Sequence, residues 1–185
     1  MFLSREPKVA SLIAVLGAAL LVSVVIKTTG RGLGEGEVAQ VGSLVVGSAM
    51  PDAQLTDLAG GRLGLSSLRG NPMLLEFGAT WCGPCRALLG PLRKVQKDLA
   101  DKQLEVYSID VGEAAADVQA HYANRVLGGV RIVLDPESHV AREFGVQAFP
   151  TLVLVDAKGI IRFIRVGGLI DADTLRSRVE KALAR

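Results

Sequence analysis

Three kinds of hydrophobic pattern follow one another along the chain, and each predicts a different structure. Residues 9–26 form a run of 18 residues without a charged side chain, which as a helix would be about 27 Å long and would just span a bilayer core. Beyond residue 50, short segments either alternate between apolar and polar residues or are wholly apolar, and both patterns predict β-strands. Between these segments, apolar residues recur three and four positions apart, which predicts amphipathic helices.

The second and third patterns predict the order β-β-β-α-β-α-β-α-β-β-α after residue 50. The expected strands are residues 53–56, 62–65, 72–77, 104–110, 131–134, 151–156 and 160–166. The expected helices run from Cys82 to about residue 100 with a bend near Pro91, over 113–126, over 137–144, and onward from a cap at Asp171. Glycine-containing turns join the first two strands and the last two strands into hairpins. This order predicts an α/β fold with a central mixed sheet and helices on both faces.

The same patterns divide the chain into four parts. These are an N-terminal tail (1–8), a transmembrane anchor (9–26), a flexible glycine-rich linker (27–49) and one folded domain (50–185). A cleaved signal peptide would also contain an apolar run. However, no small-residue cleavage site follows Ile26, and the run is longer than is usual in such peptides, so we favour an uncleaved anchor. Residues 44–46 are apolar, and an alternative is that they belong to the domain.

Composition excludes one class of function. The chain has 21 lysine and arginine residues and 19 aspartate and glutamate residues, for a net charge of +2. The basic residues are scattered rather than clustered, so no nucleic-acid surface is predicted. The length of 185 residues and the 49% of hydrophobic residues fit one domain with a membrane appendage.

The only two cysteines, Cys82 and Cys85, lie where an apolar strand gives way to a helix. At a helix start, free backbone N–H groups and the helix dipole favour the thiolate, which is the form of cysteine that attacks disulfides. Cys82 is therefore the expected nucleophile, exposed and with a lowered pKa. Cys85, one turn further on, is the expected resolving thiol and should be more buried. Such a redox-active disulfide needs no cofactor.

Most other uses of a Cys-x-x-Cys pair fit this sequence less well than redox chemistry. A zinc site usually takes four ligands, and no second cysteine pair is present. Covalent haem attachment needs a histidine where Arg86 stands. A structural disulfide in so short a loop would constrain little. A copper or zinc chaperone that uses both thiolates, with His121 or His139 as a further ligand, stays open as the alternative.

The segment Trp81-Cys82-Gly83-Pro84-Cys85 resembles the active site of thioredoxins, and Phe149-Pro150-Thr151 resembles the cis-proline loop that faces it in that fold. Further matches in the correct order are similar to the membrane-anchored TlpA/ResA-like branch; they lie at 50–52, 55–57, 68–70, 134–136, 145–146 and 167–169. The resemblance covers about residues 47–185. It implies a thioredoxin-like fold with an N-terminal β-hairpin and an inserted strand–helix unit between residues 110 and 150.

The resemblance also implies roles for residues around the cysteines. The residues expected to shape the site and contact the substrate are Trp81, Gly83, Pro84, Phe149, Pro150 and Thr151. Glu76 lies where thioredoxins keep a buried acid, which would move a proton to or from the resolving thiol. The alternatives are a core position for Trp81, a solvated position for Glu76 and a plain loop end at Pro150.

Three residues depart from the family pattern. Ser108 stands at about the place of a lysine that partners the buried acid, so Glu76 should be protonated more easily. Gly78 replaces a common aromatic residue and leaves the site either more open or filled from elsewhere. Pro91 follows Cys82 by nine residues, one more than in typical relatives, so the helix kink should be displaced or contain a bulge.

These observations predict a thiol–disulfide oxidoreductase in the cell (inner) membrane, with a single span. The resemblance implies that its domain lies on the periplasmic or extracytoplasmic side. By resemblance it reduces disulfides in exported client proteins, with cytochrome c maturation or copper-site thiols as candidate processes. A membrane thiol protein would act as its electron donor. We expect a monomer, with neither nucleic acid nor metal as a partner.

Overall fold

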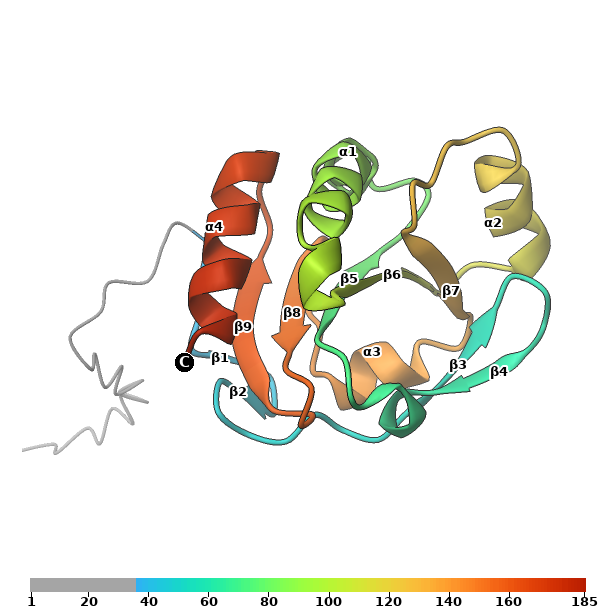
Figure 1. The fold of residues 1–185 in the computed structure, drawn as a ribbon. Coiled ribbons are helices and arrows are strands. Elements are labelled where there is room, and N and C mark those ends of the chain that lie inside the picture. Colours follow the sequence, from blue (N-terminus) through green and yellow to red (C-terminus); the bar gives the residue numbers. More distant parts are fainter. Residues whose placement is uncertain (1–35) are drawn as a thin grey trace, which may run out of the picture. The chain divides into compact units, whose positions relative to one another are not determined.

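The computed structural model describes residues 36–185, which form a seven-stranded mixed sheet and a separate two-stranded hairpin. The strand order of the large sheet is β4-β3-β7-β6-β5-β8-β9, in which β5, β6 and β7 run parallel and the other neighbours are antiparallel. Its strands are β3 (Gln54–Asp57), β4 (Arg62–Gly64), β5 (Met73–Gly78), β6 (Glu105–Val111), β7 (Arg131–Asp135), β8 (Thr151–Val155) and β9 (Ile161–Val166). The predicted central mixed sheet is confirmed (Figure 1).

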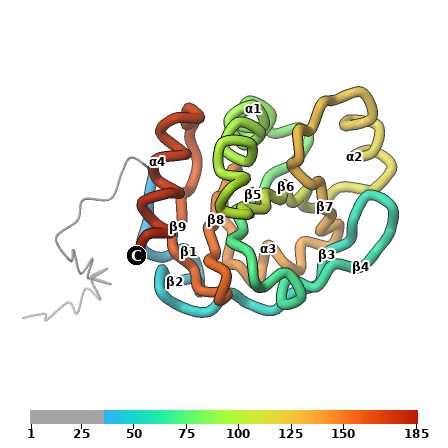
Figure 2. Tube along the Cα trace, in the orientation of Figure 1, coloured from blue at the N-terminus to red at the C-terminus, as the bar shows by residue number. Residues whose placement is uncertain are grey.

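Helices cover both faces of this sheet. They are α1 (Gly83–Asp98), α2 (Ala115–Tyr122), α3 (His139–Glu143) and α4 (Ala172–Leu183), with the short 3-10 helices η1 (Leu65–Leu68) and η2 (Ala100–Lys102). Figures 1 and 2 show α1, α2 and α4 on one face of the sheet and α3 on the other. The apolar residues of the first three helices form one core, and those of α3 and η1 form another. Each face of the sheet therefore has its own hydrophobic core.

The central strand β5 contributes side chains to both cores, which explains its nearly continuous apolar sequence. Met73 and Leu75 belong to the core on the α3 side, and Leu74 belongs to the core beneath α1. Because side chains alternate along a strand, Glu76 shares the α1 side with Leu74. The one charged residue of this strand is therefore directed beneath the helix that carries the cysteines.

Helix α1 starts directly after Cys82 and ends two residues before the expected position of about 100. Pro84 lies in its first turn, where proline costs no hydrogen bond. The helix continues through Pro91. Its buried stripe consists of Cys85, Leu88, Leu92 and Val95. This stripe fixes the first turn of the helix, and with it the cysteines, over the sheet.

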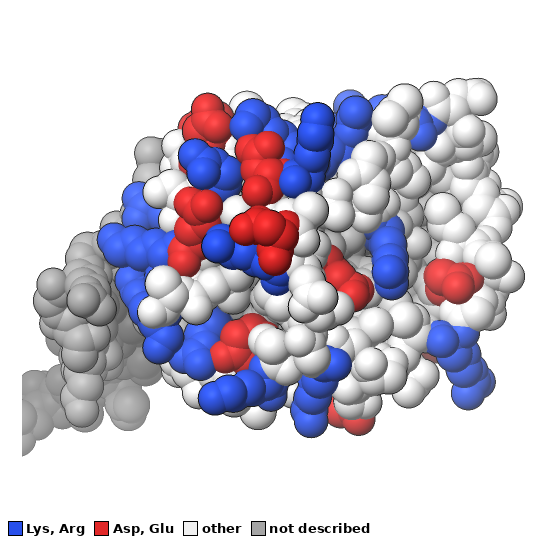
Figure 3. Space-filling model, viewed as in Figure 1, with Lys and Arg blue, Asp and Glu red and all other residues white. Residues whose placement is uncertain are grey.

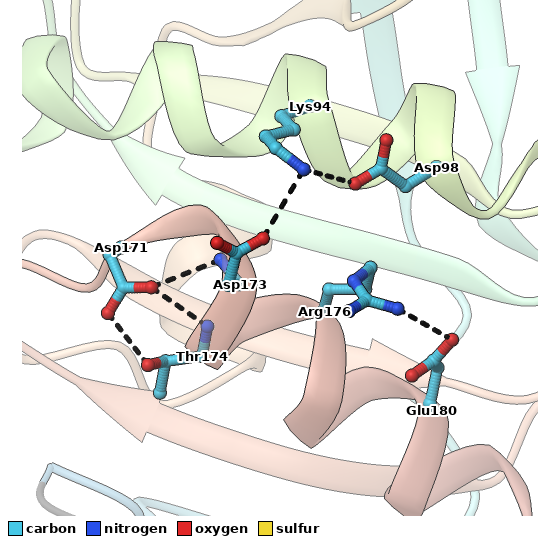
Figure 4. Close-up of polar contacts among 7 residues, drawn as sticks. All are labelled: Lys94, Asp98, Asp171, Asp173, Thr174, Arg176 and Glu180. Atoms are coloured by element: carbon cyan, nitrogen blue, oxygen red, sulfur yellow. Dashed lines mark hydrogen bonds and ion pairs between the residues drawn. The ribbon is translucent and has the colours of Figure 1, made fainter.

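Charged side chains of both signs are interspersed over α1 and α4 (Figure 3). Lys94 of α1 contacts Asp98 at 2.6 Å and Asp173 of α4 at 3.3 Å, so one ammonium group links the two helices (Figure 4). Asp171 accepts hydrogen bonds from the backbone N–H groups of Asp173 and Thr174, which confirms the predicted helix cap. Exposed ion pairs of this kind stabilise a fold only slightly, so the apolar face of α4 provides most of its attachment.

Residues 36–49 pack on the domain instead of forming a flexible linker. At the outer edge of β9, the backbone N–H of Val166 donates to the carbonyl of Gly36 at 2.9 Å. The strands β1 (Gln40–Val41) and β2 (Leu44–Val45) then form a hairpin, and Leu44 is buried in the core on the α3 side. The linker prediction is wrong for residues 36–49, because this segment pairs with backbone groups that an edge strand leaves free. Strands of two residues are too short to show any periodicity in a sequence.

The helices between β6 and β8 are shorter than expected. Helix α2 covers residues 115–122 rather than 113–126, and α3 covers 139–143 rather than 137–144. After α2 the chain turns through Gly128 and Gly129, with φ of 57° and 91°, which is a conformation that other residues rarely adopt. The segment where an inserted strand–helix unit was expected contains β7 and α3.

The predicted tail (1–8), the predicted anchor (9–26) and residues 27–35 lie outside the described residues. Among the helices of residues 36–185, none is both long and apolar enough to cross a bilayer. The anchor stays a prediction from the sequence.

Candidate active site

The two cysteines lie together at the start of α1 and form a disulfide. The sulfur atoms are 2.04 Å apart and the Cα atoms 5.3 Å apart. Cys82 is the N-cap of the helix, and its Sγ accepts a hydrogen bond from the backbone N–H of Cys85 at 3.2 Å. The first turn therefore presents a donor to this sulfur, an arrangement that stabilises a thiolate once the disulfide is reduced.

Both cysteines are covered in this disulfide form. Cys82 is 6% exposed and Cys85 is 8% exposed, so the expected contrast between an exposed Cys82 and a buried Cys85 is wrong for this state. The residues that pack against the pair are Ala79 and Phe149. Phe149 comes from a distant part of the chain, which is why spacing around the cysteines did not reveal this cover.

An apolar groove opens beside the disulfide. Trp81 is 66% exposed, which rules out a core position, and its ring centroid lies 6.0 Å from that of Phe149. The groove encloses about 530 Å³ between residues 81–84 on one side and residues 146–149 on the other. Of the six residues predicted to contact a substrate, the structure places Trp81, Gly83, Pro84 and Phe149 in this groove.

The remaining two, Pro150 and Thr151, connect the groove to the sheet. The peptide bond between Phe149 and Pro150 is cis. Thr151 is buried at the start of β8, where it pairs with Phe77 of β5, and its hydroxyl donates to the carbonyl of Ala148 at 2.7 Å. Antiparallel pairing of β8 with β5 thus carries the cis-proline loop to the end of the sheet where α1 begins.

Glu76 is 2% exposed, so the alternative of a solvated carboxylate is excluded. The hydroxyl of Ser108, its neighbour in β6, donates to Oε2 at 2.6 Å, whereas Oε1 has no hydrogen-bond partner among residues 36–185. Burial raises the pKa of Glu76 to about 7, although the hydrogen bond from Ser108 opposes the rise. A carboxyl with such a pKa can either hold or release a proton near neutral pH.

Gly78 brings this carboxyl and the disulfide together. A Cβ atom added to Gly78 would lie 2.4 Å from Glu76 Oε1 and 3.0 Å from Cys85 Sγ. Since both distances are measured from the same Cβ position, Glu76 Oε1 and Cys85 Sγ are at most the sum of the two distances apart, about 5.4 Å. The space that an aromatic residue would take at this position is therefore filled by Glu76 and Cys85, and the glycine allows the acid to approach the resolving cysteine.

Two acids that sequence reasoning did not single out lie beside these residues. Asp110, at the end of β6, is 3% exposed and pairs with Gly78. Glu113 accepts hydrogen bonds from the backbone N–H of Thr80 at 2.6 Å and from its hydroxyl at 2.5 Å. The two-residue period of β6 could have placed Asp110 near Glu76. By contrast, nothing in the sequence indicates the contact between Glu113 and Thr80.

Within the described part of the chain, no three side chains of His, Cys, Asp or Glu are grouped so that they could hold a metal ion. His139 has a side chain that is 64% exposed and forms a 3.0 Å contact with Glu137.

Replacing Gly78 with alanine should disturb the contact between Glu76 and Cys85. The added methyl group would overlap the Glu76 carboxyl and press on Cys85. Overpacking of this kind typically costs about 1–3 kcal/mol, so we expect the free energy of unfolding to fall by that amount in urea denaturation of the oxidised protein.

Gly90→Ala is the matched control. A Cβ at Gly90, on the exposed side of α1, would meet nothing within 4 Å. The gain in helix propensity is opposed by the restriction that Pro91 imposes on the residue before it, so stability should change by only about 0.5 kcal/mol. Equal stability of the two variants would show that the space around Gly78 is not limiting.

The fold and this disulfide together define a thioredoxin-like thiol–disulfide oxidoreductase. Residues 46–164 match the AhpC/TSA family. Since the match spans well over half of the sequence, the chain belongs to the AhpC/TSA family.

Individual relatives agree with this assignment. The thiol-disulfide oxidoreductase ResA of Geobacillus kaustophilus is 31% identical over 134 residues, which cover 72% of this chain and 76% of that protein. The thioredoxin-like protein YneN of Bacillus subtilis is 34% identical over 65% of this chain and 71% of its own length. Among solved structures, one described as the thiol:disulfide interchange protein DsbE from Chlorobium tepidum superimposes with a TM-score of 0.69 at 29% identity, and covers 76% of this chain and 99% of that one.

Proposed function

We propose that the protein reduces disulfides in exported client proteins, acting from a membrane anchor. The observation that carries this proposal is a disulfide that borders an open apolar groove and has a protonatable acid, Glu76, within about 5.4 Å of Cys85. The groove offers a surface for a polypeptide, and the acid supplies the proton transfer that dithiol exchange requires.

The reaction starts from the reduced dithiol. The Cys82 thiolate attacks one sulfur of the client disulfide, the bond between the client sulfurs breaks, and the released client sulfur takes up a proton. Cys85 then loses its proton and attacks the Cys82 sulfur of the mixed disulfide. The second client sulfur leaves as a thiolate, and the Cys82–Cys85 disulfide seen here is restored. Two electrons have then passed from the protein to its client.

Glu76 is proposed to accept the proton of Cys85 in the second step. A pKa of about 7 lies near physiological pH, where a general base both accepts and returns a proton efficiently. Its Oε1 is directed into the space beside Cys85 and has no competing hydrogen bond within residues 36–185. The same carboxyl would return the proton when the disulfide is reduced again.

The surroundings of the groove favour a polypeptide as the substrate. Trp81 and Phe149 offer apolar contacts, and residues 146–149 line the opposite wall. A client segment lying along this wall would pair with it as an added strand does. Substrate binding through Trp81, Gly83, Pro84, Phe149, Pro150 and Thr151 is part of the proposal.

The location and the partners are proposed from the sequence. The charge-free run 9–26 would anchor the protein in the inner membrane, with the domain on the periplasmic or extracytoplasmic side. An oxidising compartment lacks a thiol pool, so a membrane thiol protein would have to supply the electrons. The candidate clients are apocytochromes c and copper-site thiols.

The redox state in the cell tests the direction of the reaction. We expect alkylation with a thiol mass tag to find Cys82 and Cys85 mostly reduced, and the purified full chain to catalyse insulin reduction by dithiothreitol. A mostly oxidised pair would indicate an oxidase instead. A stable 1:1 copper or zinc complex without insulin reduction would favour a metal chaperone.

A further inference from the structure

A second buried acid stands beside Glu76, and the mechanism above does not use it. Asp110 is 3% exposed, and its Oδ1 has no hydrogen-bond partner among residues 36–185. Val106 belongs to the core beneath α1, so the alternation of β6 also directs Ser108 and Asp110 to that side. Asp110 therefore lies next to Gly78, over which the Glu76 carboxyl is placed.

Asp110 is also connected to the loop that precedes the cysteines. Its carboxyl lies within hydrogen-bonding reach of the Glu113 carboxyl. The two oxygens of Glu113 accept from the N–H and the hydroxyl of Thr80 at 2.6 and 2.5 Å. Arg86 in the first turns of α1 donates to the carbonyl of Thr80 at 3.1 Å. Thr80, two residues before Cys82, is thus held at its N–H, its hydroxyl and its carbonyl.

The direction of the Asp110–Glu113 hydrogen bond follows from the two environments. Burial raises the pKa of Asp110 to about 8, and the hydrogen bond to Glu113 and the negative charges of Glu113 and Glu76 add to the rise. Partial burial also raises the pKa of Glu113, but hydrogen bonds from Thr80 and Asp110 outweigh it, and that pKa is lowered overall. At neutral pH, Asp110 therefore keeps its proton and donates a hydrogen bond to the Glu113 carboxylate.

We propose that Asp110 is a positioning residue for the dithiol. When protonated, it donates a hydrogen bond to Glu113, and Glu113 in turn fixes Thr80 and the loop that leads to Cys82. When Asp110 ionises, this fixation of the loop is lost. Ionisation would place two carboxylates in contact, and like charges at such a distance repel. The Glu113 carboxyl would then move away from Asp110, and its bonds to Thr80 would weaken. The proposal rests on the proposed function, because the loop matters only if Cys82 exchanges disulfides.

Other ionisable groups lie around Asp110 on β5 and α2. On β5, Glu76 has its pKa raised to about 7. On α2, burial lowers the pKa of His121 below its usual value of 6.5, and burial raises the pKa of Tyr122 to about 12. The cationic side chains around His121 are Arg86 of α1 and Arg125 after α2. A step near pH 8 in the environment of Thr80 is therefore assigned to Asp110 by its loss in Asp110→Asn and its persistence in Glu76→Gln.

The first test follows the backbone amide of Thr80 by nuclear magnetic resonance in the oxidised full chain in detergent micelles. We expect its chemical shift to change with a midpoint near pH 8. The step should vanish in Asp110→Asn, which keeps an N–H donor for Glu113 but cannot ionise. In Glu76→Gln the midpoint should fall by about one pH unit or more, because a neighbouring charge shifts a pKa by about 1–3 units. This readout does not depend on turnover.

The second test measures reductase rates between pH 6 and 9.5. Asp110→Ala removes the donor and should be about 3- to 10-fold slower than the wild type below pH 8, since small displacements of a reacting group cost up to about 100-fold. Above pH 8 the difference should shrink, because the wild type then loses the same donor. Asp110→Asn should recover most of this rate and should lack the alkaline decrease of the wild type. Asp101→Asn makes the same chemical change at a side chain that is 73% exposed, and should behave like the wild type.

The outcomes separate this inference from the proposed function. A Thr80 amide that does not titrate near pH 8, or a step that persists in Asp110→Asn, would overturn the role of Asp110 whatever the activity. If the step behaves as expected but the wild type reduces no disulfide, the proposed function fails while the link from Asp110 to Thr80 stands. If Asp110→Ala does not fold, Asp110→Asn still decides both tests.

Discussion

Replacing Cys85 with serine should leave Cys82 covalently joined to its client. Without the second thiol the mixed disulfide cannot be resolved, so turnover should fall at least about 1,000-fold, as it does when a covalent catalyst loses an essential group. Purification of the full-length variant under non-reducing conditions should then retain disulfide-linked proteins. These adducts should dissociate on reduction, and mass spectrometry would identify them as clients or as the electron donor.

The matched control is Cys82→Ser. It should be equally inactive but should capture nothing, because the sulfur at the helix start is the one that the first turn presents with a donor. Adducts that accumulate through Cys85 in Cys82→Ser would reverse the assignment of the nucleophile.

Glu76→Gln should make the protein more stable at alkaline pH. An unfolded glutamate releases its proton near pH 4.5, whereas burial keeps Glu76 protonated up to about pH 7 in the fold. Between these values the folded state holds more protons, so stability falls as the pH rises and stays lower above about pH 7. A difference of about 2.5 pH units corresponds to about 3 kcal/mol, which glutamine avoids because it has no charge to bury.

Urea denaturation of the oxidised protein at pH 5 and pH 8.5 would measure this effect. We expect the variant to gain up to about 3 kcal/mol over the wild type at pH 8.5 and little or nothing at pH 5. The control is Glu137→Gln, at a side chain that is 78% exposed, which should show no such difference. If Glu76→Gln gave the same change in stability at both pH values, Glu76 would not be a buried acid with a raised pKa.

Several parts of the site follow from local sequence alone. A strand, a short loop and Cys-x-x-Cys at a helix start put Cys82 at the N-cap, because strand and helix periodicities are local properties. Glu76 stands out in the sequence as the one charge in an otherwise apolar strand, but its burial was implied only by the resemblance to thioredoxins; the structure confirms that it is buried. The cap at Asp171 was equally local, since its side chain reaches only two or three residues ahead.

Other parts depend on which strands become neighbours. The contact of Phe149 with the cysteines exists because β8 pairs with β5, and pairing between residues as distant in the sequence as Phe77 and Thr151 leaves no local pattern. The place of Asp110 beside Gly78 depends on the register of β6 against β5. A shift of one residue in that register would turn the acid to the other face of the sheet.

The sequence by itself determined the class of fold and the redox pair, because hydrophobic periodicity and short motifs act within one element. The tertiary structure decided between a buried and a solvated Glu76. Only the tertiary structure decided that residues 36–49 cover the edge of β9, that both cysteines of the disulfide are shielded and that Gly78 lets Glu76 reach Cys85. The tertiary structure also decided that Asp110 and Glu113 connect Glu76 to Thr80. These features arise from contacts between elements distant in the chain, where packing and backbone pairing, rather than local propensity, set the distances.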